Sequence, residues 1–509
     1  MFVKVNSAGI NGISARMILT EGDVGNGLPS FTLVGYLASE VREAQDRVRT
    51  AIKNAGFTLP AKKITINLSP ADQRKEGTAY DLSIAVAVLG AYGLLPMERL
   101  EQCLVVGELG LDGRIKPVHG VMAMAIAAKR AGMVHCFVPK ENAQEALAIE
   151  GIRVTGLNSL KEFADMLVSS APIPETLREN DSDRTKEAVW DVDYSEVGGQ
   201  LFLRRAAEIA AAGMHNLLFT GPAGTGKTMI ARRLPTILPP LTMEENLEIS
   251  QIYSVCGLLA QGSALFGKRP FRSPHHTVTA QSLTGGGKPV KPGELSLATG
   301  GVLFLDELTL FRKEAIEILR QPLEEHKVHV SRVWGKYDFP ADFLLCAAMN
   351  LCPCGHFPGD RCQCTPAQIR QYLSRLSRPL MERFDICAQA SPVPYEELRR
   401  TDQRGEPSAA IRARVERARE IQTMRFRGTS VRCNGRMGEA QVRTFCTLGE
   451  KEEAFLKQIY QSRSMSARGL RKILVVSRTI ADLAGSEAIQ REHLAEAAGY
   501  RALEEKIWD

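Results

Sequence analysis

The chain has 509 residues, enough for about three domains with substantial cores, and its composition is that of an ordinary globular protein. A net charge of +6 permits a nucleic-acid partner but does not require one. The first residues lack a signal peptide's apolar core, no run reaches the ~18 apolar residues of a membrane span, and the odd count of 11 cysteines argues against a disulfide framework. We therefore expect a cytoplasmic protein with reduced thiols and no membrane partner.

Residues 1–167 alternate short β-like runs with helical stretches, which predicts an α/β or α+β domain. The predicted strands are 64–68, 103–107 and 135–139, and the predicted helices are 41–55, 81–89 and 121–131.

Four segments of this domain resemble successive pieces of the Lon proteolytic domain: 75–81, 107–114, 127–132 and 138–142. Lon-type proteolysis needs a serine activated by a lysine base. The resemblance places the serine position near Thr78 and the lysine position on Met122, whose thioether cannot act as a base. We therefore expect a catalytically dead relic that serves assembly or substrate contact, with residual proteolysis through another base as the alternative.

Residues 168–190 are polar and charged and contain Pro172 and Pro174, which indicates a linker. The next segment contains a phosphate loop of the pattern G-x-x-x-x-G-K-[ST], which lies between a predicted strand at 216–220 and a predicted helix at 229–234. This motif marks residues 191–394 as the predicted ATPase core. The residues expected to hold ATP here are Gly221, Gly224, Thr225, Gly226, Lys227 and Thr228, with Lys227 on the β/γ-phosphates and Thr228 on Mg²⁺.

Two further strands supply the polar groups that a phosphate loop needs. The strand 302–305 ends in Asp306, which we expect to orient the Mg²⁺ shell, and Glu307, which we expect to polarise the attacking water. The strand 343–349 ends in Asn350, an amide placed to contact the γ-phosphate or that water, although a plain turn former is the alternative. In this order the motifs resemble Walker A, Walker B and sensor 1 of AAA+ ATPases.

A long insertion separates the two Walker motifs. It carries the adjacent His275 and His276 and the cations Lys288 and Lys291, which are candidates for DNA contact. Consecutive side chains on a strand point apart, so a hydrogen-bonded loop anchor is favoured over a metal site at the histidine pair.

After the Walker B strand, 325–332 and 337–340 predict a β-hairpin with Arg332, Trp334 and Lys336 around its tip. An aromatic ring and two cations suit a DNA strand, through base stacking and phosphate contact. A solvated hairpin with no ligand is the alternative.

Four cysteines follow Asn350 within thirteen residues: Cys352, Cys354, Cys362 and Cys364. Four thiols so close in a reducing compartment suit a tetrahedral structural Zn²⁺. The C-x-C spacing is tighter than the usual C-x₂₋₄-C knuckle, so reduced thiols in a polar loop stay open as the alternative.

The end of the core carries Arg383, which resembles an arginine finger that reaches a neighbouring subunit's ATP; a surface salt bridge is the alternative. Residues 395–509 predict a helical lid domain. There Ser466 is expected to cap a helix whose first turn holds Arg468, which resembles a sensor 2 arginine. Arg478 and Asp482 are spaced for a salt bridge within that helix.

The order of these motifs along nearly the whole chain resembles the ComM/YifB family of magnesium-chelatase-like AAA+ proteins. The resemblance implies a Lon-protease-like α+β N-terminal domain, a parallel-sheet AAA+ core and a C-terminal helical lid. It also implies a homohexameric ring that uses ATP and Mg²⁺ to move on single-stranded, forked or junction DNA, and so drives branch migration during natural transformation. Recombination proteins are candidate partners. The chain departs from the family pattern at Leu351 and Arg378.

Two other functions stay open at this point. A chelatase-like motor would insert a metal with a partner that bears a D-x-S-x-S site, and no such motif occurs here. A protein-remodelling ATPase would usually carry an aromatic-Val-Gly pore loop, which is also absent.

Overall fold

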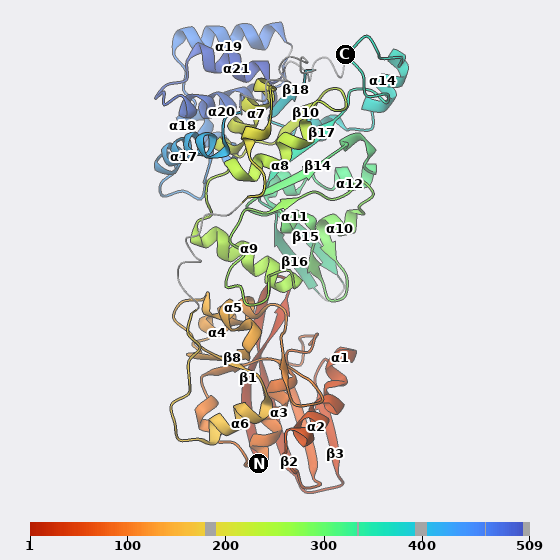
Figure 1. Cartoon of the computed structure of the whole chain (residues 1–509), viewed down its shortest axis with the longest axis vertical. Helices are drawn as coiled ribbons and strands as arrows, with labels where there is room; N and C mark the ends of the chain where they lie inside the picture. The colour runs from red at the N-terminus through yellow and green to blue at the C-terminus, as the bar shows by residue number, and fades with distance from the viewer. Residues whose placement is uncertain (179–189, 333–334, 392–404, 464, 502–509) are drawn as a thin grey trace. The chain divides into compact units, whose positions relative to one another are not determined.

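The computed structural model describes residues 1–178, 190–332, 335–391, 405–463 and 465–501. These residues form two compact units (Figure 1). The described residues of the first unit lie within Met1–Lys186, Thr242–Gly267 and Gly286–Pro292, and those of the second within Glu187–Leu241, Lys268–Gly285 and Gly293–Asp509. The insertion between the Walker motifs therefore contributes residues to both units.

The first unit is built on a seven-stranded mixed sheet in the order β3-β4-β2-β1-β5-β8-β9. The strand β1 pairs antiparallel with β2 and parallel with β5, so the sheet changes from antiparallel to parallel pairing at its centre. Its strands are β1 (Phe2–Asn11), β2 (Ser14–Gly25), β3 (Ser30–Val34), β4 (Lys63–Ser69), β5 (Cys103–Val105), β8 (His135–Pro139) and β9 (Arg153–Leu157), and a small ribbon joins β6 (Glu108–Leu109) to β7 (Ile115–Lys116).

Helices complete the core of this unit. Every residue of α3 (Asp81–Ala91) is buried. The helix consists almost entirely of apolar and small residues, so it has no polar face to turn toward water. The other helices are α1 (Ser39–Arg42), α2 (Ala44–Asn54), α4 (Val121–Arg130), α5 (Ala143–Leu147) and α6 (Leu160–Val168). The predicted strands and helices of residues 1–167 are thus confirmed, with the helix predicted over 41–55 divided at Glu43.

Helix α9 (Met243–Cys256) comes from the insertion but packs within the first unit. Its Gln251 donates a hydrogen bond of 2.7 Å to the carbonyl of Ile13, and the N–H of Gly120 donates to the carbonyl of Ser254 at 3.2 Å. The buried carboxylate of Glu145 also accepts a hydrogen bond from the Ser254 hydroxyl. A helix of the segment between the Walker motifs is therefore part of the Lon-like fold.

The second unit contains a five-stranded parallel sheet in the order β11-β14-β17-β10-β18. The strands β10 (Leu217–Thr220), β14 (Val302–Leu305) and β17 (Leu344–Met349) are buried throughout, as expected for a parallel sheet covered on both faces. The outer strands are β11 (Phe271–Arg272) and β18 (Ile386–Gln389). Because the strands run in one direction, the residues that follow β10, β14 and β17 meet at one edge of the sheet.

Helices and a hairpin surround this sheet. The hairpin consists of β15 (Lys327–Arg332) and β16 (Gly335–Pro340). A short ribbon of the insertion pairs β12 (Gly285–Gly286) with β13 (Lys291–Pro292), and Gly286–Pro292 belong to the first unit. The helices are α7 (Leu201–Gly213), α8 (Lys227–Ile237), α10 (Ala280–Thr284), α11 (Glu294–Leu297), α12 (Lys313–Glu317), α13 (Pro322–Glu325), α14 (Pro366–Leu373) and α15 (Arg378–Met381).

The C-terminal part is helical and shares one hydrophobic core with the sheet and with α7 and α8. It comprises α17 (Ser408–Arg425), α18 (Glu439–Phe445), α19 (Glu450–Ser462), α20 (Ala467–Leu483) and α21 (Arg491–Gly499). Ile411, Val415 and Ala418 of α17 are buried, which confirms the predicted apolar face.

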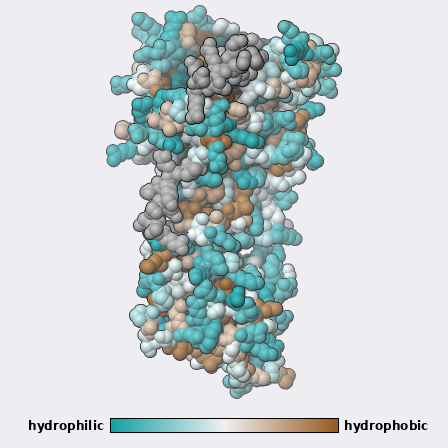
Figure 2. Space-filling view, viewed as in Figure 1, coloured by the Kyte–Doolittle hydropathy of each residue, from teal (hydrophilic) through white to brown (hydrophobic). Residues whose placement is uncertain are grey.

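No helix in the described ranges combines the length and apolarity needed to cross a bilayer. Hydrophilic residues cover most of the face seen in Figure 2, with hydrophobic residues scattered among them.

Candidate nucleotide site and cysteine cluster

The phosphate loop joins the end of β10 to the start of α8. Its glycines Gly221, Gly224 and Gly226 have φ angles of 134°, 77° and 85°, a range that other residues rarely adopt. A Cβ atom on Gly221 would lie 2.7 Å from the carbonyl oxygen of Ala390, so a side chain has no room there. The backbone N–H groups at the start of α8 are thereby free to face an anion.

Lys227 lies under this loop with only 8% of its surface exposed. Its ammonium group donates hydrogen bonds to the carbonyls of Gly221 (2.8 Å) and Pro222 (2.6 Å) and to Oδ1 of Asn350 (3.3 Å). Burial lowers the pKa of Lys227, and the charge of Asp306 opposes that shift. The phosphate loop and the end of β17 thus meet at one ammonium group, and the γ-phosphate contact of Asn350 stays a prediction.

A second polar contact joins the first turn of α8 to the residue that follows β14. Thr228 donates from Oγ1 to Oδ2 of Asp306 at 2.8 Å. Mg²⁺ prefers oxygen ligands such as a hydroxyl and a carboxylate, so these two residues would hold the Mg²⁺ of a bound nucleotide.

Glu307 follows Asp306 with an unusual backbone. Its φ angle is 53°, in the left-handed region, and its side chain is exposed. Its N–H donates to Asp306 Oδ1 at 3.0 Å. This conformation is costly for a residue with a Cβ, and strained backbones of this kind cluster at active sites, which fits the predicted role of Glu307.

Asn216 also organises this region, although its role was not predicted from the sequence. Its side-chain oxygen accepts from the N–H of Leu345 at 3.1 Å, and its side-chain nitrogen donates to the carbonyl of Arg383 at 3.1 Å. Its own N–H donates to Asp385 at 2.9 Å. One amide therefore fixes the register of the central strands and the segment that carries Arg383; a polar residue directly before a buried strand was the only sequence signal.

The two candidate arginines have acidic partners within the second unit. Arg383 is paired with Glu324 of α13, and Arg468 donates to Glu382 at 2.9 Å. Ser466 caps α20 by accepting from the N–H of Gly469 at 3.1 Å, which confirms the predicted cap and places Arg468 in the first turn. The finger and sensor roles of the two arginines stay predictions.

The predicted salt bridge inside α20 is also present. Arg478 and Asp482 are 3.0 Å apart, and Asp482 additionally pairs with Arg425 and accepts from Asn434 at 2.7 Å. The pair therefore belongs to a buried network that joins α17 to α20.

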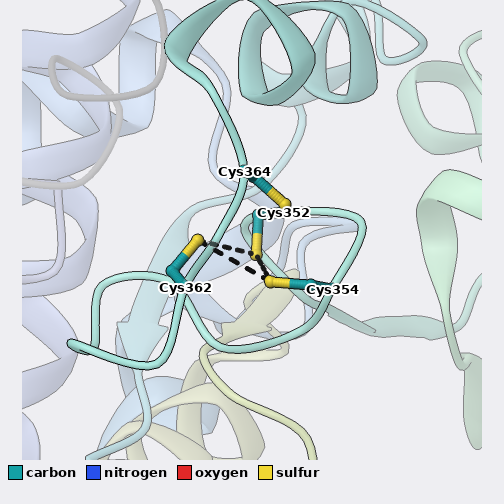
Figure 3. A group of neighbouring side chains, drawn as sticks. All are labelled: Cys352, Cys354, Cys362 and Cys364. Atoms are coloured by element: carbon teal, nitrogen blue, oxygen red, sulfur yellow. Dashed lines mark hydrogen bonds between the residues drawn. The ribbon is translucent and has the colours of Figure 1, made fainter.

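The four cysteines after β17 lie together (Figure 3). All four sulfur atoms are within 4.8 Å of one another. Cys352 is 3.3 Å from Cys354 and 3.7 Å from Cys362, and Cys354 is 3.7 Å from Cys362. A tetrahedral ion with metal–sulfur bonds of about 2.3 Å needs sulfur separations of about 3.8 Å, so three of the sulfurs are already close to that arrangement.

The histidine pair lies outside any strand, since β11 ends at Arg272. The rings of His275 and His276 have centroids 4.0 Å apart and are tilted by 36°, so they do not point apart as expected for a strand. His275 Nδ1 lies 2.9 Å from the hydroxyl of Thr277, a contact typical of a loop anchor.

The candidate DNA contacts fall in both units. Lys288 and Lys291 belong to the first unit. In the second, Arg332 and Lys336 are exposed near the tip of the hairpin, where Arg332 pairs with Gly335 and Ser331 with Lys336. Trp334 lies outside the described residues.

In the first unit, the hydroxyl of Thr78, at the predicted serine position, donates a hydrogen bond to the carboxylate of Glu108. Met122 is fully buried, and its N–H donates to Glu145 at 2.7 Å. The predicted lysine position of the Lon-like site is thus filled by an apolar side chain beside the carboxylate that holds α9.

Comparison with known proteins places these features in one family. Residues 193–398 match the model of magnesium chelatase subunit ChlI, residues 20–142 a second ChlI model, and residues 405–501 the ChlI C-terminal model. The chain is 42% identical to the competence protein ComM of Haemophilus influenzae and 41% identical to YifB of Escherichia coli, in each case over 97% of this chain and 96% of the relative. Lon protease 2 of Bacillus subtilis is 26% identical over 26% of this chain and 24% of its own length. The chain therefore belongs to the ComM/YifB family of magnesium-chelatase-like AAA+ ATPases.

Proposed function

We propose that this protein is an ATP-driven DNA translocase and helicase that promotes branch migration in homologous recombination during natural transformation. The observation that carries the proposal is that the second unit combines a full set of nucleotide-hydrolysis groups with a hairpin that exposes cations. The name of the Haemophilus relative, a competence protein, supports the biological setting.

The hydrolysis step uses residues that already lie together. Lys227 and the N–H groups of the phosphate loop bind the phosphates, and Thr228 and Asp306 would hold Mg²⁺, which would supply positive charge to the phosphates. Glu307 accepts a proton from the attacking water, and Asn350 orients that water or the γ-phosphate.

The DNA contact is assigned to the β15–β16 hairpin. Val328, Val330 and Phe339 are buried, whereas the residues that alternate with them are exposed, so one face of the hairpin is anchored and the other is accessible. Lys336 is on the accessible face near the tip, whereas Arg332 follows Val328 and Val330 on the anchored face but is exposed because it ends the strand; at both positions a cation can bind phosphates without reading sequence. Lys288 and Lys291 are candidates for further contacts.

A homohexameric ring gives Arg383 its role. In such a ring the finger of one subunit would stabilise charge on the ATP of the next, and it would exchange its contact with Glu324 for that phosphate. Recombination proteins are proposed partners of the ring in the cytoplasm.

We also propose that Cys352, Cys354, Cys362 and Cys364 hold one structural Zn²⁺. Four cysteine thiolates are a usual donor set for zinc, with iron as the other metal that accepts it, and here the four sulfur atoms lie within 4.8 Å of one another. Metal analysis of the purified protein, with the colour of the sample as a check for iron, tests this assignment.

The DNA assignment is tested by alanine at Arg332 and Lys336, with Lys327→Ala at the other end of the same hairpin as the matched control. We expect the double variant to bind DNA of every sequence more weakly. We also expect the slope of log affinity against log salt concentration to become less steep by about two, because two phosphate contacts are removed. Unchanged affinity and slope would contradict the assignment. ATP turnover that responds to a protein partner, and not to DNA, would instead favour a chelatase-like or protein-remodelling motor.

A further inference from the structure

The cysteine loop touches the phosphate loop directly. The N–H of Ala223, inside the phosphate loop, donates a hydrogen bond of 3.1 Å to the carbonyl of Gly355, the residue after Cys354. Gly355 is buried between the two loops, and a Cβ atom on it would lie 3.5 Å from Nδ2 of Asn350 and 3.6 Å from Cβ of Ala223. One residue of the cysteine loop therefore contacts both the phosphate-binding loop and the predicted γ-phosphate sensor.

Little besides the cysteines holds this loop in place. Between β17 and α14 it contains no helix or strand. Within 351–364 only Leu351, Cys352 and Gly355 are buried, while Phe357 is 38% exposed. Short turns fix it locally, with the N–H of Gly355 donating to Cys352 at 3.1 Å. A loop with so few apolar contacts is stabilised mainly by cross-links, and the four sulfur atoms are the groups positioned to supply them.

We infer that metal bound by the cysteine cluster braces the phosphate loop, so that metal occupancy sets the affinity for nucleotide. The inference rests on the proposed metal site and adds a regulatory role to it. With metal bound, the Gly355 carbonyl is held where it orients Ala223 and limits the freedom of Asn350. Without metal, the cysteine loop opens and the phosphate loop must be ordered by the nucleotide itself, which costs affinity.

Two variants separate metal binding from the brace. Cys354→Ser with Cys364→Ser removes two ligands from the outer part of the loop, and Cys256→Ser, outside the cluster, is the matched control. Gly355→Ala keeps all four thiols but places a Cβ on a residue with a φ of 76°, so the backbone that carries the Gly355 carbonyl must shift away from Ala223.

The experiment measures bound metal and the affinity for a fluorescent ADP analogue in the full-length protein. We expect the double cysteine variant to lose metal and to bind ADP about five-fold more weakly, Gly355→Ala to keep its metal and lose a similar factor, and Cys256→Ser to match wild type. Wild-type affinity in a metal-free double variant, or a wild-type protein that neither holds nor takes up metal, would overturn the inference. Because ADP binding requires neither turnover nor DNA, failure of the proposed motor function would appear separately, as absent ATPase activity.

Discussion

Arg468 in the first turn of α20 donates a hydrogen bond of 2.9 Å to Glu382, the residue directly before Arg383. One turn further along the same helix, Lys472 pairs with Asp385 at 3.0 Å. The start of α20 is thereby tied to the chain on both sides of Arg383. A movement of this lid helix is expected to shift Arg383, and in the proposed ring that shift would link a subunit's own lid to its neighbour's nucleotide.

Arg468→Ala should lower the rate of ATP hydrolysis about tenfold, because it removes a cation from the lid and frees Glu382. The rate is measured at saturating ATP. Arg417→Ala, which removes an exposed arginine of α17, should leave the rate unchanged. Equal rates for both variants would show that Arg468 has no role in hydrolysis.

Arg383→Ala should lower turnover by about a thousandfold while ADP binding stays intact, as expected for an arginine finger. If the finger acts on a neighbouring subunit, mixing this variant with Lys227→Ala should restore activity, since a mixed ring contains sites that combine an intact lysine with an intact arginine. Random assembly at equal amounts predicts recovery at about one quarter of the sites. Mixtures as inactive as the separate variants would argue for action within one chain.

His215 should make the second unit sensitive to acid. It is fully buried, its Nε2 lies 2.7 Å from the hydroxyl of Thr479 in α20, and burial lowers its pKa to about 4, with Asp385 opposing and Arg436 adding to the shift. Since the unfolded histidine titrates near 6.5, its neutral form stabilises the fold fully above that pH. As the pH falls below that value, the free energy of unfolding decreases, and the loss due to His215 is about 3 kcal/mol at pH 4.

Urea unfolding between pH 7 and pH 4.5 tests this with His215→Asn, which cannot titrate. The variant should be less stable than wild type at pH 7 and lose less stability on acidification. Carboxylates away from His215 titrate in both proteins and cancel in the comparison, whereas Asp385, whose pKa is lowered in part by His215, belongs to the effect that is measured. An identical loss in the two proteins would contradict the assignment to His215.

Glu145→Ala should loosen α9 from the first unit. The carboxylate accepts from the N–H of Met122 at 2.7 Å, from Asn142 at 3.0 Å and from the Ser254 hydroxyl, and it is 6% exposed. Removing it leaves these buried donors unpaired, at a cost of about 1–3 kcal/mol each. Limited proteolysis within 242–267 should become faster, whereas the exposed Glu141→Ala should be cut like wild type. Unchanged cleavage would show that other contacts hold the helix.

The parts of the nucleotide site that follow local rules could be predicted from the sequence. The phosphate loop is flanked by the expected strand and helix, and Asp306 and Asn350 lie at neighbouring strand ends because parallel strands end at one edge. The Ser466 cap and the Arg478–Asp482 pair depend on residues three and four positions apart, so their spacing alone was sufficient.

Contacts between distant segments could not be predicted in this way. Glu145 and Ser254 are 109 positions apart, and nothing in either local pattern indicates that a helix between the Walker motifs packs on the Lon-like fold. The same holds for the Gly355 carbonyl and the Ala223 N–H, because every residue carries these backbone groups and only the tertiary fold pairs them.

The central claim is that ATP hydrolysis drives movement on DNA, and the most direct test is the ATPase rate of the purified protein with and without DNA. Single-stranded, duplex, forked and four-way-junction DNA are compared, with Glu307→Gln as the control that binds ATP but loses at least about a hundredfold in turnover. We predict clear stimulation by forked or junction DNA. A normal basal rate that no DNA changes would contradict the DNA-motor account.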